Sequence, residues 1–258
     1  MRLDRALVER GLVRSRTRAA RLIAQERVRV DGMTVTRAAH EVGSDAALEA
    51  DVDEWVSRAA HKLLAALADS GTVVAGRVLD AGASTGGFTQ VCLARGAAVV
   101  YAVDVGHGQL AATLRDDPRV VVREGLNLRH LTVADLGGLP VDLIVGDVSF
   151  ISLRLLLAPL AAVLAPGGTA LLLVKPQFEV GRERLGAGGV VREESLREEA
   201  VTGVIAEAAD LGLACDWRGR SVLPGAGGNV EFFVRLVAHP AGQGFAEQTT
   251  STSATRPR

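Results

Sequence analysis

The feature that most constrains this chain is a glycine-rich turn between a short apolar strand and a helix. Residues 77–79 predict a buried strand, and residues 89–95 predict the helix that follows it. Three glycines between them, Gly82, Gly86 and Gly87, let the backbone turn tightly and approach a ligand closely. In doubly wound α/β folds such turns lie at the carboxyl ends of parallel strands, where nucleotide-type ligands bind.

The spacing of the turn narrows the choice of ligand. No Gly-Lys-Ser/Thr follows, so the turn is not a triphosphate-binding loop, and it is not the Gly-x-Gly-x-x-Gly of dinucleotide sites. Asp80 at the tip of the strand would repel a pyrophosphate but suits a ligand that carries an ammonium group. The turn therefore favours S-adenosylmethionine over an ordinary strand–helix connection. The candidate contacts in this segment are Asp80, Gly82, Ser84, Thr85, Gly86 and Gly87.

Positive charge is concentrated at the start of the chain. The 258 residues have a net charge of −1, but residues 1–30 hold nine arginines against three acidic residues. Two short helices and a hairpin with Asp31-Gly32 at its turn are predicted there. A basic module on a neutral protein is typical of contact with a nucleic-acid backbone, although a solvated helix face is the simpler alternative. The candidate RNA-binding residues are Arg2, Arg5, Arg14, Arg16, Arg18 and Arg21.

Composition argues against several other classes. The two cysteines imply no disulfide framework and fit a reducing cytoplasm, and the scattered histidines predict no metal site. Residues 155–174 carry no charge and are long enough to span a bilayer. Pro159 and Pro166-Gly167-Gly168 interrupt this stretch, so we expect a helix, a turn and a buried strand. With no signal peptide at its start, the chain is expected to be soluble and cytoplasmic.

The chain is expected to contain two domains and a tail. We expect a small α+β domain at 1–48, a linker at 49–57, an α/β domain at 58–238 and a disordered tail at 239–258. The apolar pair Trp55-Val56 in the linker should dock on one of the domains. In the larger domain, strands and helices alternate as in a doubly wound parallel sheet. The expected strands are 77–81, 98–104, 119–123, 141–147, 169–175, 213–217 and 229–237, with helices at 58–69 and 195–211.

Polar residues follow several of these strands. Asp104 ends the second strand, where an acid can bind both hydroxyls of an adenosine ribose. Asn127, after the third strand, is placed either to reach the adenine edge or to form a simple turn. Asp147 ends the fourth strand, and we expect it beside the transferring group.

Two lysines and a second carboxylate complete the set. Lys175 ends the apolar fifth strand, where a lysine is costly to bury unless it is paired or functional. Lys62 lies in the helix before the first strand, and Glu231 begins the last strand. Each alone fits a snorkelling lysine or a structural carboxylate. Together with Asp147 they predict a site.

The first 48 residues resemble the alpha-L RNA-binding domain named after a small-subunit ribosomal protein. The matching motifs are Arg2-Leu3-Asp4-Arg5-Ala6-Leu7, Ser15-Arg16-Thr17-Arg18-Ala19-Ala20-Arg21-Leu22-Ile23 and Val28-Arg29-Val30-Asp31-Gly32. The family usually has glycine where this chain has Glu26. Because glycine ends a helix in a left-handed conformation without strain, Glu26 should be strained or replaced by another cap.

The remainder resembles the FtsJ-like ribose 2′-O-methyltransferases, and the whole chain resembles the TlyA family. The matching segments are 57–63, 79–89, 147–153, 174–181 and 228–231. The resemblance implies a class I (Rossmann-like) methyltransferase sheet of seven strands, S-adenosylmethionine as cofactor and cytidine in ribosomal RNA as substrate. It also implies a catalytic tetrad of Lys62, Asp147, Lys175 and Glu231, and it leaves the oligomeric state open.

A ribose 2′-hydroxyl is a poor nucleophile, so a general base, or a charge that stabilises the forming alkoxide, would help. Lys175 is the candidate for that role, and Asp147 and Glu231 would orient the two lysines. Two other functions compete with this hypothesis: an RNA-binding ribosome-assembly factor, and a membrane-active haemolysin, a label that the family has carried. The sequence predicts no strongly basic amphipathic helix and no uninterrupted membrane span, and this argues against the haemolysin hypothesis.

Overall fold

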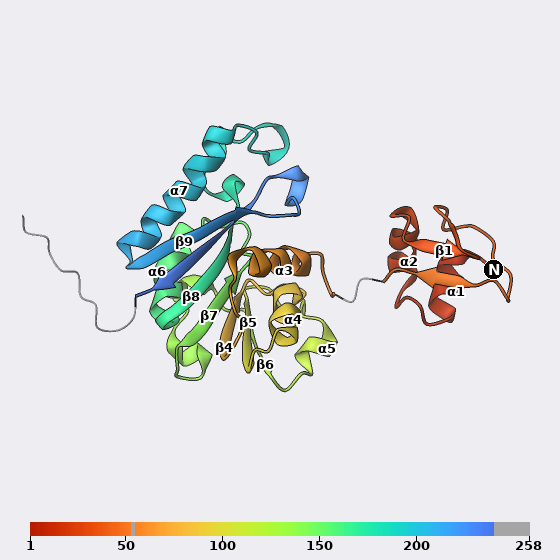
Figure 1. Cartoon of the computed structure of the whole chain (residues 1–258), viewed down its shortest axis with the longest axis horizontal. Coiled ribbons are helices and arrows are strands. Elements are labelled where there is room, and N and C mark those ends of the chain that lie inside the picture. Colours follow the sequence, from red (N-terminus) through yellow and green to blue (C-terminus); the bar gives the residue numbers. More distant parts are fainter. Residues whose placement is uncertain (53–54, 240–258) are drawn as a thin grey trace, which may run out of the picture. The chain divides into compact units, whose positions relative to one another are not determined.

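The computed structural model describes residues 1–52 and 55–239, and it divides the chain into two units, residues 1–54 and 55–258. The expected linker overlaps residues 53–54, and the expected disordered tail falls on residues 240–258. Both segments lie outside the described residues. The two units are described separately below (Figure 1).

The first unit packs two helices against a small antiparallel sheet. Its elements are α1 (Leu3–Glu9), α2 (Arg16–Ala24), β1 (Val28–Val30), β2 (Met33–Thr34) and β3 (Leu48–Ala50), with β1 in the centre of the sheet. Leu3, Leu7, Ile23 and Val28 are fully buried in its core. Ser15 caps α2 as its sequence position predicts, since its side chain accepts a hydrogen bond from the backbone N–H of Arg18 at 3.3 Å.

Two backbone predictions in this unit are confirmed. Asp31 and Gly32 have φ values of 50° and 79°, as a type I′ hairpin turn requires, and Val30 pairs with Met33 across the turn. Glu26, just after α2, adopts a φ of 60°. This left-handed backbone conformation is strained for a residue other than glycine. Glu26 therefore adopts the strained conformation that the sequence predicts for it.

The second unit is built on a seven-stranded sheet, which confirms the predicted fold class (Figure 1). Its order is β6-β5-β4-β7-β8-β10-β9, and β10 alone runs antiparallel to both of its neighbours. The strands are β4 (Arg77–Ala81), β5 (Val99–Asp104), β6 (Val120–Glu124), β7 (Val141–Gly146), β8 (Leu164–Val174), β9 (Leu213–Arg220) and β10 (Phe232–Ala238). The α-helices are α3 (Ala59–Ser70), α4 (Gly87–Ala94), α5 (Ala112–Arg115), α6 (Arg154–Val163) and α7 (Glu194–Asp210).

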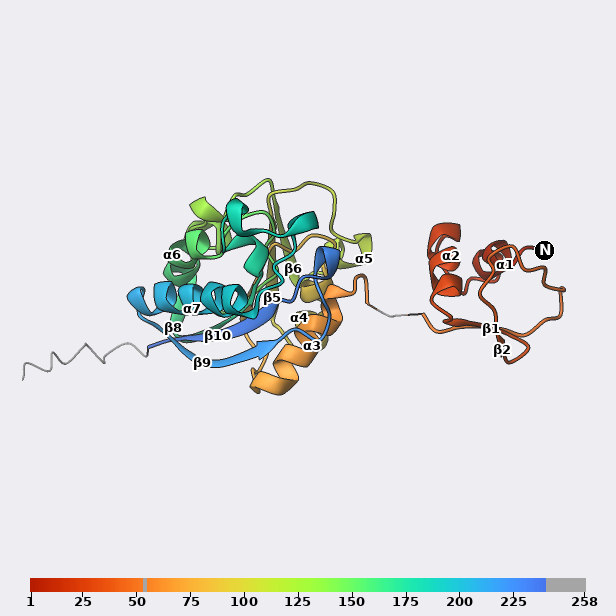
Figure 2. The same ribbon diagram turned by 90° about the horizontal axis from the view of Figure 1, so that it is seen from above.

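Helices cover both faces of this sheet. Helices α6 and α7 pack on one face, and α3 and α4 pack on the other (Figure 2). Neighbouring residues of one strand point to opposite faces: Leu79 belongs to the first core and Val78 to the second. Strands buried on both faces explain the continuous apolar runs of the sequence.

Some boundaries differ from the prediction. Strand β8 begins at Leu164, so residues 165–168 belong to the strand instead of forming a separate turn. Gly167 has a φ of 74°, and the register against β7 shifts in this region. A glycine-rich insertion of this kind bends a strand without ending it. Within the described residues, no helix has the length and apolar character that a membrane span needs.

The ends of two other elements are also shifted. Helix α3 begins at Ala59, with Arg58 in the cap position, and Ser57 contributes an acceptor for the Ala59 N–H at 3.2 Å. Strand β10 begins at Phe232, so Glu231 lies just before the strand. Trp55 and Val56 pack on the core that α3 and α4 share with the sheet, as their apolar character predicts.

Candidate active site

The predicted site residues of the second unit gather at the carboxyl ends of β4, β5, β7 and β8. Two cavities lie there, with volumes of about 510 and about 300 Å³. Both sizes fall in or near the range of small-molecule sites in proteins, which is about 300–1,000 Å³. The two cavities share four lining residues, Gly82, Ser84, Asp147 and Ser149. They therefore adjoin each other along the tip of β7.

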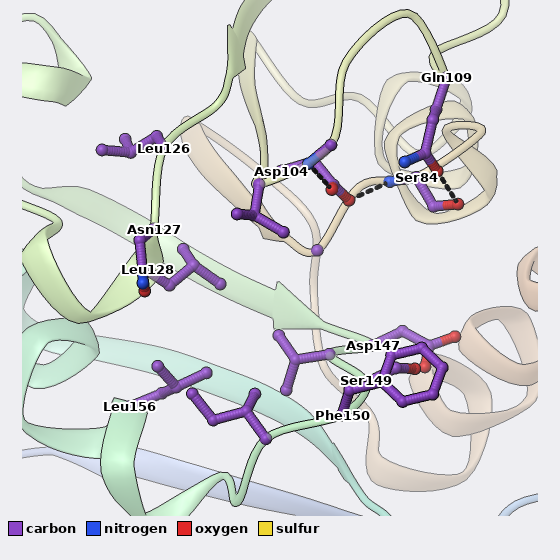
Figure 3. Close-up of a pocket in the computed structure, with 15 residues that line it drawn as sticks. Ser84, Asp104, Gln109, Leu126, Asn127, Leu128, Asp147, Ser149, Phe150 and Leu156 are labelled. Carbon is purple, nitrogen blue, oxygen red and sulfur yellow. Dashed lines mark hydrogen bonds between the residues drawn. The ribbon is translucent and has the colours of Figure 1, made fainter.

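Asp104 organises the larger cavity (Figure 3). One carboxylate oxygen accepts a hydrogen bond from the Ser84 backbone N–H at 2.8 Å, and the other accepts from the Gly106 N–H at 2.7 Å. The carboxylate thus joins the turn after β4 to the turn after β5. Because an ionised carboxylate offers about four acceptor positions, Asp104 keeps capacity for two further hydroxyl donors.

The opposite wall of this cavity is largely apolar. Asn127 lies on it among apolar side chains (Figure 3), and its side-chain oxygen accepts a hydrogen bond from the Arg129 N–H at 3.0 Å. Asn127 therefore caps the short helix Leu128–His130 and lines the cavity as well. Of the two roles considered for Asn127, the structure shows the one in a turn. Contact with the adenine stays a prediction. The apolar lining residues are Val105, Leu126, Leu128, Val148, Phe150, Ile151 and Leu156.

The glycines of the turn differ in their roles. Gly82 lines both cavities with a φ of 84°, and a side chain there would contact Val148 and the Asp147 carbonyl oxygen. Gly86 lines neither cavity; a Cβ there would collide with the side chains of Leu110 and Leu114.

The remaining turn residues face the smaller cavity. Gly87 lines it, and a Cβ there would collide with the Ser57 side chain. Thr85 also lines this cavity. The glycines thus serve close packing of the turn against α5 and the start of α3, as well as approach to a ligand.

Asp80 lies beneath the turn and lines neither cavity. It is fully buried, and one carboxylate oxygen accepts a hydrogen bond from the Thr89 hydroxyl at 2.6 Å. The other oxygen has no hydrogen-bond partner among the described residues. Burial raises the pKa of Asp80 to about 7, against the lowering effect of the Thr89 hydrogen bonds. Because Asp80 lines neither cavity, the expected contact between Asp80 and a ligand stays a prediction.

The four residues of the predicted tetrad form two ion pairs. Lys62 Nζ donates to Glu231 Oε2 at 2.6 Å, and Lys175 Nζ lies 2.6 Å from Asp147 Oδ1. Lys62, Lys175 and Asp147 line the smaller cavity, and Glu231 lies behind Lys62 with 2% of its surface exposed. The structure therefore brings the whole set together.

Each pair has additional support. Lys175 Nζ also donates a hydrogen bond to Ser149 Oγ at 2.6 Å. The contact between Lys175 and Asp147 is a close ion pair without hydrogen-bond geometry, since Asp147 Oδ1 has no hydrogen-bond partner among the residues that the structure describes. Behind the other pair, Gly225 packs directly on the Glu231 carboxylate, and a Cβ there would collide with it.

A buried carboxylate that the sequence analysis missed anchors the loop after β7. Glu179 accepts hydrogen bonds from the Ser152 hydroxyl and from the Leu153 backbone N–H, both at 2.6 Å. The rings of Phe150 and Phe178 contact each other between this anchor and Lys175, with centroids 5.5 Å apart. The loop after β7 is thus fastened along its length to the segment after β8.

The number of lysines in the sequence is itself informative. The whole chain contains two lysines, Lys62 and Lys175, among 29 basic residues. Both are buried at the site, while every other basic position is arginine. Arginine cannot lose its proton in a protein, whereas a lysine can. This distribution alone singles out Lys62 and Lys175 as candidate site residues.

The candidate RNA-binding arginines of the first unit fall into two groups. Arg2 and Arg16 pair with the buried Asp4 at 3.1 and 2.9 Å, and their hydrogen bonds lower the pKa of Asp4 to about 2. Arg5 pairs with Glu9 at 2.6 Å.

The other three lie on or beside α2. Arg14 and Arg21 are exposed and form no ion pair within the described part of the chain, and Arg18 is half-buried. No group of His, Cys, Asp or Glu residues that could hold a metal occurs among residues 1–52 and 55–239.

Both units match known families. Residues 1–48 match the S4 domain, and residues 55–237 match the FtsJ-like methyltransferases. The chain is 51% identical to the 16S/23S rRNA (cytidine-2′-O)-methyltransferase TlyA of Mycobacterium tuberculosis, over 91% of this chain and 89% of that protein. It is 41% identical to YqxC of Bacillus subtilis, over 94% and 87% of the two chains.

A solved structure from Streptococcus thermophilus, described as a candidate haemolysin, matches with a TM-score of 0.74 and 38% identity. The match covers 96% of this chain and 92% of that one.

Proposed function

The chain belongs to the FtsJ-like methyltransferase family, and from this premise we propose that it transfers a methyl group from S-adenosylmethionine to the ribose 2′-oxygen of cytidine in ribosomal RNA. The observation that carries the proposal is the meeting of the two ion pairs, Lys62–Glu231 and Lys175–Asp147, beside a cavity that adjoins a second, larger one. The relative from M. tuberculosis bears the name of this activity.

The larger cavity suits the nucleoside part of the cofactor. Asp104 would hold the ribose hydroxyls, since its oxygens keep free acceptor positions beside the two backbone N–H groups. Val105 and Leu128 on the apolar lining would contact the adenine, and Asn127, which lines the same cavity, would reach the adenine edge. The turn at Gly82 and Ser84 would hold the methionine part, because these residues line both cavities.

The smaller cavity would receive the target nucleotide. When bound, the cofactor supplies an activated methyl group. Because Lys175 is an ammonium while it pairs with Asp147, Nζ would first release a proton to solvent. The neutral amine would then take the proton from the 2′-hydroxyl as the oxygen is methylated, and this proton would restore the ammonium. Asp147 holds Lys175 from one side, and the buried pair of Lys62 and Glu231 closes the back of the cavity. Holding the hydroxyl in line with the methyl group supplies much of the remaining rate enhancement.

The first unit would bind the ribosomal RNA through its phosphates. Its arginines are concentrated on and beside α2, and Arg14 and Arg21 are exposed. Phosphate contacts fix the register and orientation of a protein on nucleic acid without reading sequence. Recognition of the target base is thus left to the second unit.

The test is transfer of tritiated methyl groups from S-adenosylmethionine to purified ribosomal subunits that lack the modification. After digestion of the RNA, the label is expected in 2′-O-methylcytidine. Label in a base-methylated nucleoside would overturn the proposed acceptor atom. Tight binding to subunits without any label, although the cofactor binds, would support the RNA-binding assembly factor instead.

A further inference from the structure

Ser149 stands between the two cavities and contacts the lysine of the reaction centre. It lies two residues after Asp147 in the loop that follows β7 (Figure 3). It lines both cavities. Its Oγ accepts the hydrogen bond from Lys175 Nζ at 2.6 Å. Nothing in the predicted tetrad assigns a role to this residue.

The Lys175 ammonium or amine needs more than one contact to be held in place. A lysine side chain carries its compact ammonium group on a flexible stem of four carbons. A single ion pair therefore leaves the position of Nζ poorly fixed. Asp147 Oδ1 approaches Nζ at 2.6 Å without hydrogen-bond geometry. The Ser149 hydrogen bond is directional and therefore supplies the constraint that the ion pair lacks.

The loop gives Ser149 a firm support for this task. Glu179 anchors the same loop through Ser152 and Leu153, and Phe178 contacts Phe150 directly beside Ser149. Phe150 has a φ of 66°, which is strained for an aromatic residue. Phe150 itself is 92% exposed, so the support comes from its ring contact with Phe178 and from the anchor at Ser152 and Leu153.

We propose that Ser149 is a positioning residue that fixes the Nζ of Lys175 toward the target hydroxyl. This inference rests on the proposed function of the site. Its effect works through Lys175 and does not require Ser149 itself to touch the methyl group or the RNA. A displacement of about 1 Å of a reacting group can reduce a rate by about 10²-fold, so loss of this hydrogen bond should be visible in kcat.

The test compares Ser149→Ala and Ser149→Thr with the wild-type protein in the methyl-transfer assay on ribosomal subunits. We expect Ser149→Ala to lower kcat by about 10- to 100-fold, with a much smaller change in the Kd for the cofactor. Ser149→Thr keeps the hydroxyl and should recover most of the rate. Ser152→Ala is the matched control, since it removes a hydroxyl from the same loop without touching Lys175, while the Leu153 N–H still holds the loop to Glu179. It should lower Tm and reduce kcat much less than Ser149→Ala does.

A spectroscopic measurement follows the contact itself. Because the chain has two lysines, protein labelled with 15N at lysine Nζ gives one signal each for Lys62 and Lys175. Ser149→Ala should shift the signal of Lys175 and leave that of Lys62 in place. The Glu231 partner of Lys62 is untouched by this substitution.

The outcomes separate this inference from the proposed function. An inactive wild-type protein would defeat the proposed function. An active wild type with an equally active Ser149→Ala would overturn the positioning role alone. Equal losses in Ser149→Ala and Ser152→Ala, or no recovery in Ser149→Thr, would assign the effect to loop order and also overturn it.

Discussion

Lys62 and Glu231 lie 169 residues apart in the sequence, yet their charged atoms are 2.6 Å apart. The pair joins α3, before the first strand of the sheet, to the segment just before β10. Both side chains are largely buried, at 11% and 2% exposure. The contact therefore links the two ends of the methyltransferase unit at the wall of the smaller cavity.

Removing one member of this pair should destabilise the protein. Glu231→Ala leaves the Lys62 ammonium buried without its partner, and we expect a loss of about 3–5 kcal/mol in the free energy of unfolding. The double variant Lys62→Met/Glu231→Leu replaces both charges by apolar side chains and should recover most of that loss. Urea unfolding measures both values. If Glu231→Ala proves as stable as the wild type, the pair does not hold the wall as described.

Asp80 should make stability depend on pH. Its pKa is about 7 in the folded chain and about 3.8 when unfolded, because burial disfavours the carboxylate. Folding therefore takes up a proton between these values, and this group's contribution to the free energy of unfolding falls as pH rises from about 4 to about 7.

Asp80→Asn should remove that part of the pH dependence. The measurement is urea unfolding of both proteins across this pH range, with Asp210→Asn at the exposed end of α7 as control. A wild-type curve parallel to that of Asp80→Asn would refute the assigned ionisation.

The arginines of the first unit should contribute unequally to RNA binding. Arg14→Ala and Arg21→Ala each remove an exposed charge that has no ion-pair partner among the described residues. The negative slope of log K against log salt should therefore become shallower by about 0.7–1 for each variant. Arg16→Ala also removes one of the two arginine partners of the buried Asp4, so it should destabilise the unit as well. Binding of the full chain to ribosomal subunits at several salt concentrations tests this. An unchanged slope for Arg14→Ala and Arg21→Ala would exclude them from the phosphate contacts.

Much of the fold could be predicted from local sequence patterns. All seven strands of the sheet were predicted. For the central strands β4, β7 and β8 the reason is that strands buried on both faces are largely apolar. The edge strand β9 alternates in burial and was predicted from its place after a helix. The Asp31-Gly32 turn was predictable for a local reason, since two successive residues with positive φ select for such a pair. The start of β8 was mispredicted, because Gly167 bends a strand in this structure where the sequence pattern indicated a break.

The site was predictable as a set of residues but not as a set of contacts. The pairing of Lys62 with Glu231 and of Lys175 with Asp147 depends on strand order, which no local pattern encodes. Ser149 lay inside a recognised motif but resembles any loop serine until its distance to Lys175 is known. Glu179 likewise becomes an anchor only once the segments after β7 and β8 lie side by side.

The most direct test of the account replaces Lys175 by arginine. Arginine keeps the positive charge beside Asp147 but cannot lose its own proton, so it cannot become the neutral base that accepts the proton of the 2′-hydroxyl. We predict that Lys175→Arg still binds S-adenosylmethionine by calorimetry, while methyl transfer to ribosomal subunits falls by about 10²- to 10⁴-fold. Transfer by Lys175→Arg at a rate close to that of the wild type would contradict the role of Lys175 as the group that accepts the proton.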